Sequence, residues 1–235
     1  MRPPRFEARF EQSAGVERLR GFIESAAAET SRMHGVPLLP NGRIDMSAFR
    51  SVRRDVSADE DSVKQLQIEW YGDISQEEIE RERAKTDGEK LEMLAYAIFY
   101  KNLAERFIVA RSSIYDDINN KIDVILVNKE TGETICAFDE VSDTSAGVDY
   151  EKKKQAVLER NKEHQGANIK YGIRLEKTGD KAGFVLGETE KVPIFYIALP
   201  KDKIERGMAN FMSSPSEQSE FEKKLFQYFI ASIDA

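Results

Sequence analysis

The sequence predicts a mixed α/β domain, in which helices cover both faces of a central β-sheet. Three observations support this fold class. Residues 89–107 carry the clearest helical periodicity, residues 121–143 have the pattern of two strands joined by a tight turn, and residues 193–199 form another apolar strand. The chain has 235 residues, enough for one good core or for one core with an appendage.

Composition restricts the function classes. The net charge is −7 and the isoelectric point about 5.2, which argues against a protein that coats nucleic acid by bulk charge. The negative net charge is still compatible with an enzyme that contacts nucleic acid locally, because metal-binding carboxylates make a metal-free enzyme acidic. The sequence has no apolar stretch of about 18 residues, so we expect no membrane span. The N-terminus shows no apolar signal region and Cys136 is the single cysteine, so we expect a cytoplasmic protein.

Charge is distributed unevenly along the chain. Residues 1–54 hold ten arginines and no lysine against six acids, whereas residues 55–92 hold thirteen acids against five basic residues. This asymmetry indicates two regions. We expect an N-terminal helical and irregular region over residues 1–73 and the α/β domain over residues 74–235.

The N-terminal region has the weaker pattern. Residues 5–30 predict two short helices, or one helix broken at Gly15. Residues 43–73 are weakly patterned, and we expect Trp70 and Tyr71 to pin them onto the core. Ser75 then begins a clear helix, because Ser75 and Glu78 have capping-box spacing.

The strongest helix starts near Glu89 and places Glu92 on the edge of its buried stripe. Glu92 is therefore either an inward-facing functional residue or a helix-edge glutamate that reaches water. The following elements are expected in this order: a strand at 107–111, an acidic turn at 114–120, strands at 121–128 and 134–141, a loop, a helix at 150–165, strands at 168–176, 184–187 and 193–199, and two C-terminal helices at 201–212 and 216–233.

The hairpin at 121–143 carries acids in apolar strands, where a carboxylate is costly unless something binds it. A four-residue turn would make Asp123 and Glu140 diagonal neighbours, whereas a five-residue loop would place Asp123 opposite Asp139. In either register, one acid of the 139/140 pair shares a face with Asp123. Two such carboxylates repel unless a proton or a cation lies between them, and hard oxygen ligands suit Mg²⁺ or Mn²⁺.

This arrangement resembles the PD-(D/E)xK nuclease superfamily, whose core runs αβββαβ. The resemblance covers residues 88–177 and rests on the inward Glu92, Asp123 in the first hairpin strand and the acidic pair Asp139-Glu140. It implies that Asp123 and either Asp139 or Glu140 bind the metal, and that Glu92 is the glutamate supplied by the first helix. Metal-dependent hydrolysis of DNA or RNA would be the activity.

The chain departs from the superfamily pattern at one position. The lysine expected two residues after the acid is Val141 or Ser142. Some superfamily members supply this lysine from the next helix, where the sequence offers Lys152, Lys153 and Lys154. Lys154 shares a helical face with Tyr150 and Val157, so we expect it to point toward the sheet and to help orient the attacking water.

Lys170, on the following strand, is the other candidate for the catalytic lysine. The expected partner is nucleic acid, which the arginine-rich N-terminal region could contact, and a homodimer is also considered. The rival interpretation is an inactive interaction or structural protein that kept the nuclease fold, which the missing lysine and the acidic charge favour.

Overall fold

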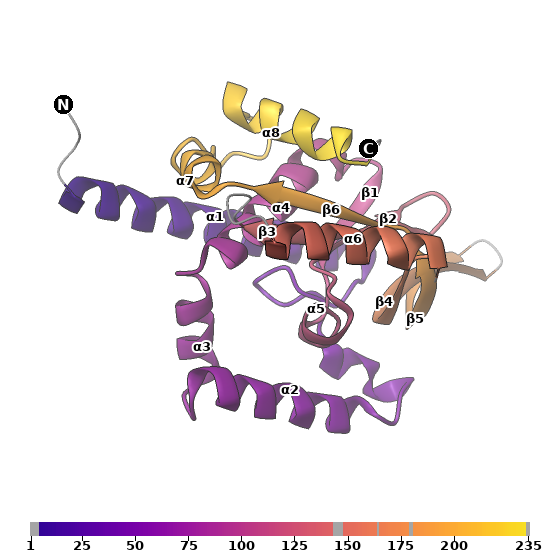
Figure 1. Cartoon of the computed structure of the whole chain (residues 1–235). Coiled ribbons are helices and arrows are strands. Elements are labelled where there is room, and N and C mark those ends of the chain that lie inside the picture. The colour runs from indigo at the N-terminus through magenta and orange to yellow at the C-terminus, as the bar shows by residue number, and fades with distance from the viewer. Residues whose placement is uncertain (1–4, 143–147, 164, 179–180, 234–235) are drawn as a thin grey trace.

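The computed structural model describes residues 5–142, 148–163, 165–178 and 181–233 (Figure 1). It confirms the mixed α/β class. Its elements, in chain order, are α1 (Arg5–His34), the 3₁₀ helix η1 (Met46–Ser51), α2 (Val56–Tyr71), α3 (Gln76–Arg83), α4 (Asp87–Leu103), β1 (Phe107–Arg111), α5 (Ile114–Asn120), β2 (Val124–Asn128), β3 (Thr134–Ser142), α6 (Val148–Glu163), β4 (Ala167–Thr178), β5 (Lys181–Val192), β6 (Ile194–Leu199), α7 (Lys201–Ala209) and α8 (Glu220–Ala231).

The central sheet has four strands in the order β1-β2-β3-β6. β2 is antiparallel to both β1 and β3, whereas β6 is parallel to β3. The strand expected at 168–176 does not join this sheet: it is β4, which pairs with β5 in a separate two-stranded sheet. The short strand expected at 184–187 is part of β5. Two long strands that are adjacent in sequence can satisfy each other's backbone locally, which leaves the place beside β3 to β6.

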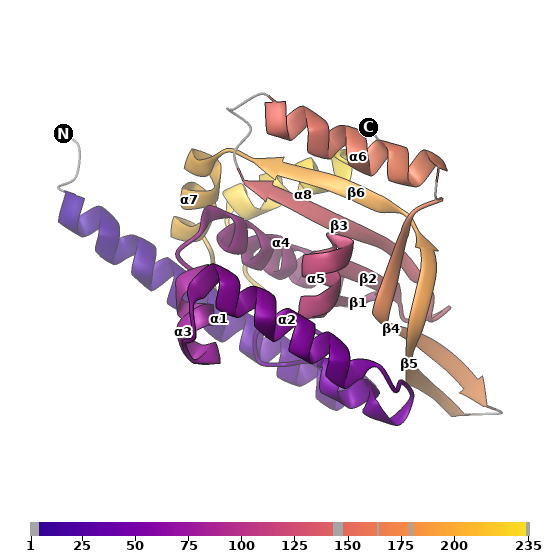
Figure 2. The ribbon, with the colours of Figure 1, turned by 60° about the horizontal axis from the view of Figure 1, so that its bottom comes forward.

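Hydrophobic side chains on the two faces of the sheet enter two core clusters. On one face, Val124 and Phe138 pack with residues of α1, α4, α7 and α8. On the other face, Ile125 and Ala137 pack with η1, α6 and the β4–β5 pair. Figure 2 shows α6 running beside β6, which it contacts. None of the described helices is both long and apolar enough to cross a membrane.

The N-terminal residues form one continuous helix, so the expected break at Gly15 is wrong. A Cβ added at Gly15 would lie 3.0 Å from the carbonyl oxygen of Met208. The glycine therefore allows α1 to approach α7 closely, and this contact outweighs its low helix propensity. α1 also contributes Leu19, Phe22 and Ile23 to the cluster that contains α4.

Two helices lie where the sequence predicted weak structure or a turn. α2 occupies most of residues 43–73, and Trp70 on it is 52% exposed, so the expectation that Trp70 pins this region to the core is wrong. α5 replaces the acidic turn at 114–120, because the Ser113 hydroxyl accepts a hydrogen bond from the amide of Asp116 and caps a short helix.

Other local predictions are confirmed. Ser75 and Glu78 form the expected capping box at the start of α3. The helix expected at 150–165 is present as α6, and the C-terminal helices are present as α7 and α8. The loop expected after the second hairpin strand falls at 143–147, outside the described residues.

The buried ion pair between α4 and α8 gives a test of the packing. Lys101 Nζ lies 2.6 Å from Glu222 Oε1, and the two side chains are 0% and 1% exposed. Glu222→Leu leaves an unpaired buried ammonium group, so we expect the free energy of unfolding to fall by about 3–5 kcal/mol. Urea denaturation measures this change. Lys223→Met, at an exposed pair on the same helix, is the control and should change stability by less than about 1 kcal/mol. Equal losses in both variants would contradict the buried pair.

Candidate metal centre

The β2–β3 hairpin combines both of the expected registers. The amide of Asn128 donates to the carbonyl of Glu133 across a four-residue turn, as the first register requires. A bulge between Leu126 and Val127 then shifts the pairing, so that Val124 lies opposite Phe138. Asp123 lies one residue before β2, and its amide donates to the carbonyl of Phe138. The extra residue of the bulge thus brings the acids together at the far end of the hairpin.

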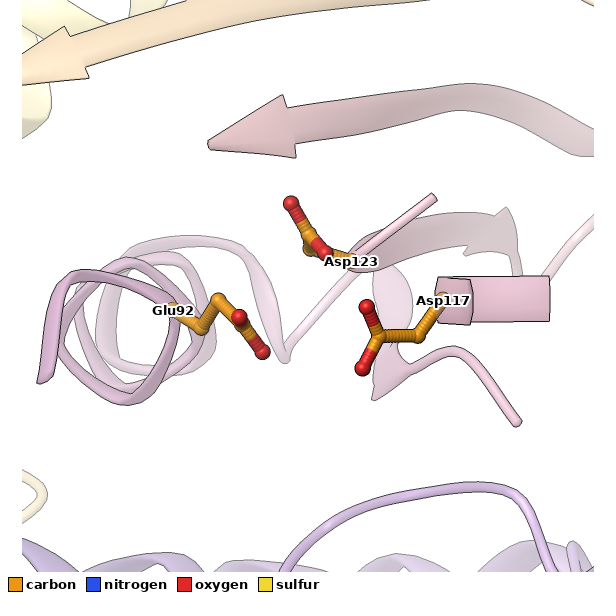
Figure 3. Close-up of side chains that lie close together, drawn as sticks. All are labelled: Glu92, Asp117 and Asp123. Atoms are coloured by element: carbon orange, nitrogen blue, oxygen red, sulfur yellow. The ribbon is translucent and has the colours of Figure 1, made fainter. Parts of the chain in front are cut away.

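Three carboxylates converge at that end of the hairpin (Figure 3). One oxygen each from Glu92, Asp117 and Asp123 lies within 4.8 Å of the others. Glu92 comes from α4, Asp117 from α5, and Asp123 from the residue before β2. The structure therefore places Glu92 inward, and Asp117 joins the two residues that the sequence had paired.

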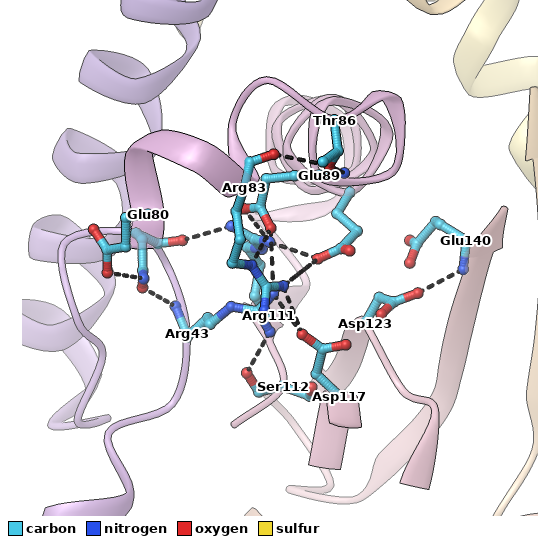
Figure 4. Close-up of polar contacts among 12 residues, drawn as sticks. Arg43, Glu80, Arg83, Thr86, Glu89, Arg111, Ser112, Asp117, Asp123 and Glu140 are labelled. Carbon is cyan, nitrogen blue, oxygen red and sulfur yellow. Dashed lines mark hydrogen bonds and ion pairs between the residues drawn. The ribbon is translucent and has the colours of Figure 1, made fainter. Parts of the chain in front are cut away.

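The acids at the end of β3 point to opposite faces of the sheet, because successive side chains of a strand alternate. Glu140 follows Phe138 toward α4, and Asp139 follows Ala137 toward the face that α6 covers. The amide of Glu140 donates to Asp123 Oδ2 at 2.7 Å (Figure 4). Glu140 is 7% exposed, and among the described residues neither of its carboxylate oxygens has a hydrogen-bond partner. Glu140 is therefore the acid of the pair that lies beside Asp123.

Three arginines, of which Arg43 and Arg111 are buried and Arg83 is partly exposed, form the wall next to the acids (Figure 4). Arg111, the last residue of β1, contacts Glu89 at 2.7 Å and Glu92 at 2.6 Å. Arg43, from the loop before η1, contacts Glu92 Oε2 at 2.8 Å and Asp117 Oδ2 at 2.8 Å.

Arg83, at the end of α3, completes the wall by contacting Glu89 at 3.0 Å and Asp117 at 2.9 Å. We call Arg43, Arg83 and Arg111 the arginine wall. It joins α3, α4, α5 and β1 through charge-assisted hydrogen bonds.

The electrostatics divide the acids into two groups. Burial alone would raise the pKa of Glu89 and of Asp117, but the neighbouring arginines outweigh it and hold both pKa values below their usual range. For Asp123 and Glu140, burial raises the pKa, and neighbouring carboxylates raise it further. The pKa of Glu92 is also raised, first by burial and then by Asp123, despite its arginine contacts. The arginine wall thus neutralises one side of the cluster and leaves the hairpin side uncompensated.

The lysines are arranged differently from the expectation. Lys154 is exposed, so the prediction that it points toward the sheet is wrong. Lys170 is bound to Asp55 at 2.9 Å and to Asp59 at 2.5 Å, so it serves the contact between β4 and α2.

The pKa of Asp139 depends on burial and on nearby lysines. Burial raises its pKa to about 6, whereas Lys153 and then Lys121 oppose the rise. Because Lys121 Nζ already donates to the carbonyl of Ile118, Lys153 is the candidate closest in role to the missing lysine.

Sequence reasoning missed the arginine wall. Its members are separated by 28 to 68 positions in the chain, and the one available signal was Arg111 at the end of an apolar strand. Arg50, Arg53 and Arg54 are closer together in the sequence than the members of the arginine wall. In the structure, Arg53 pairs with Asp55 and Arg50 with Glu60 near the protein surface.

Comparison with known proteins adds no family to this geometry. No family model matches the chain, and neither a curated protein nor a solved structure matches it.

The raised carboxyl pKa values predict an unusual pH dependence of stability. Burial raises the pKa of Asp123 to about 7 and that of Glu92 to about 8. A group that binds its proton more tightly in the folded chain stabilises the fold at low pH and loses this contribution as pH rises through the folded pKa. In EDTA, the melting temperature measured by circular dichroism should therefore fall between about pH 5 and 8.

Adding Mg²⁺ or Mn²⁺ at pH 8 should reverse that fall, because a cation replaces the lost protons. Asp123→Asn should flatten the pH dependence, whereas Glu130→Gln, at an exposed acid in the hairpin turn, should leave it unchanged. A metal-free protein that grows steadily more stable up to pH 8 would contradict this account of the cluster.

Proposed function

We propose that this protein is a metal-dependent phosphodiesterase that hydrolyses DNA or RNA, with its centre at Asp123 and Glu140. The charge balance of the cluster carries the proposal. Five carboxylates, those of Glu89, Glu92, Asp117, Asp123 and Glu140, accompany the three guanidinium groups of the arginine wall. With all five carboxylates ionised, two negative charges of this described cluster would lack a counter-charge. Protons supply it in the metal-free protein, as the raised pKa values of Glu92, Asp123 and Glu140 indicate, and one divalent cation would replace them.

The residues on the hairpin side fit such a cation. The buried oxygens of Glu140 have no geometric hydrogen-bond partner among the described residues, and the Glu140 and Asp123 carboxylates need either a shared proton or a cation between them. Carboxylate oxygens are hard ligands that favour Mg²⁺ or Mn²⁺ over softer metals. Asp123 and Glu140 would hold the ion, with Glu92 and Asp117 as the further carboxylates on its other side.

The bound cation would supply two effects, a lower pKa for a water molecule and neutralisation of phosphate charge. The protein residues position the ligands around it. Arg43 and Arg111 both contact Glu92 Oε2, which fixes this side chain and leaves Oε1 as its available ligand atom. Lys153, whose charge opposes the rise of the Asp139 pKa, is our candidate for the lysine that would orient the attacking water or stabilise charge on the phosphate.

The order of elements also supports the proposal. α4, β1, β2, β3 and α6 follow one another as helix, three strands and helix, with the short helix α5 between β1 and β2. This order is similar to the αβββαβ core of the resemblance, but the strand that the resemblance placed last, at 168–176, is β4, and β6 takes the position beside β3. Glu92 lies on α4 and Glu140 on β3, whereas Asp123 lies one residue before β2.

We predict Mg²⁺- or Mn²⁺-dependent cleavage of DNA or RNA, measured as the release of labelled fragments on a gel. Asp123→Ala should abolish cleavage, and Glu140→Gln should lower its rate by at least about 100-fold, because each removes a ligand charge from the centre. Glu130→Gln is the control and should cleave like the wild type. Unchanged cleavage in Asp123→Ala would overturn the assignment.

The same measurements separate the rival interpretation. An inactive interaction protein should show no cleavage and no rise in melting temperature when metal is added. A rise that Asp123→Asn abolishes, without any cleavage, would instead keep the metal site and remove the hydrolysis.

Two adjacent lysines of α6 form a matched pair. Lys153→Met should lower the cleavage rate by at least about 100-fold, which is typical of a lost group that transfers or orients protons. Lys154→Met should stay within about threefold of wild type, because both residues are exposed but Lys153 alone of the two influences Asp139. Single-turnover rates at saturating metal make the comparison. The reverse order of effects would restore the assignment that the sequence favoured.

A further inference from the structure

A large cavity lies on the far side of the arginine wall from the hairpin acids. Its volume is about 970 Å³, at the upper end of the range for small-molecule sites. Apolar side chains from α1, α2, α3 and α4 line much of it, among them Ile23, Val63, Ile79 and Met93. Figure 1 shows how α2 and α3 extend away from the sheet on this side. The cavity can therefore accept a flat apolar group between its walls.

The polar lining of the cavity contains acids, such as Glu60, Glu80 and Glu89, as well as hydrogen-bond donors. Arg43, Arg83 and Arg111 all line it, and Gln67 lines it from α2. Arg111 is 1% exposed, and its buried Nε has no acceptor among the described residues. A buried donor without a partner is costly, so it calls for an acceptor atom from a ligand. Because Arg111 is already paired with two glutamates, that acceptor need not carry a charge.

The arginine wall also fixes how far the cavity lies from the acids. Arg43 and Arg83 line the cavity and also contact Asp117 Oδ2 at 2.8 and 2.9 Å. One layer of side chains therefore separates the inner end of the cavity from the cluster of Glu92, Asp117 and Asp123. A phosphate at the acids and a base in the cavity would therefore contact opposite sides of the same arginine wall.

We propose that the cavity binds an unpaired nucleobase of the substrate strand, an inference that rests on the proposed function. A nucleobase has apolar faces for the cavity walls and uncharged oxygen and nitrogen acceptors for Arg111 Nε, and bases also stack on guanidinium planes. The amide of Gln67 both donates and accepts, so it can pair with the edge of the base. A base inside a duplex offers neither its faces nor its pairing edge, so the substrate is single-stranded or has a base turned out of the helix.

An uncharged probe tests the cavity independently of the metal centre. The fluorescent nucleoside 2-aminopurine riboside, titrated into the full-length protein in EDTA, should show a saturable change in fluorescence. Gln67→Leu should weaken this binding by about 10-fold, the effect of one lost hydrogen bond. Gln65→Leu, the same change at an exposed position of α2 outside the cavity, should bind like the wild type. Val63→Phe, which narrows the cavity, should also weaken binding.

Circular dichroism first confirms that each variant is folded. No saturable binding to the wild type, or equal binding by the Gln67→Leu and Gln65→Leu variants, would overturn the base site. A second measurement compares cleavage of a single strand with that of the same strand lacking one base beside the cleaved bond. Cleavage that is indifferent to the missing base would remove the cavity from the substrate site and leave the hydrolysis intact. Nucleoside binding without any cleavage would keep the base site and remove the hydrolysis.

Discussion

The buried contact between the arginine wall and its carboxylates is the interaction on which the rest of the structure depends. Arg43, Arg83 and Arg111 come from a loop, a helix end and the end of β1, and of these segments β1 is also held by its pairing with β2. A buried charge without a partner is strongly destabilising, so each guanidinium group must meet its carboxylates at one position. Backbone bonds between Arg111 and the residues beside Arg43 add to this restraint. The α2–α3 segment is thereby fixed to the body of the domain.

The wall neutralises its own side of the cluster but not the hairpin side. Fold stability alone would favour an apolar residue at position 140, because burying the Glu140 carboxylate oxygens without hydrogen-bond partners costs free energy. Such a conflict between local stability and sequence is typical of functional sites. The hairpin bulge also costs local stability, because it interrupts the hydrogen-bond ladder between β2 and β3. It brings Asp123 to the end of β3, where Glu140 lies.

The sequence predicted what local periodicity controls. The helix around Glu92 and the hairpin strands follow from apolar spacing and strand alternation. The convergence of Asp123 with Glu92 was implied by the resemblance to the nucleases. The remaining features depend on contacts between residues far apart in the chain. The arginine wall has no local signal, and the bulge shifts the register by one position, which no pattern in the apolar strands specifies. The separation of β4 from the central sheet depends on its pairing with β5, an alternative equally compatible with its apolar pattern.

The two proposed sites share one set of side chains, and this has a thermodynamic consequence. Arg111 offers a buried donor to the cavity and at the same time contacts Glu92 of the acid cluster. A ligand that draws the guanidinium group toward the cavity weakens its hold on Glu92 and makes that carboxylate more available to a cation. Binding free energies are reciprocal, so a cation on Glu92 must strengthen the base site by the same factor. Occupation of both sites by one substrate strand is then favoured over occupation of either alone, because the arginine wall lies between them.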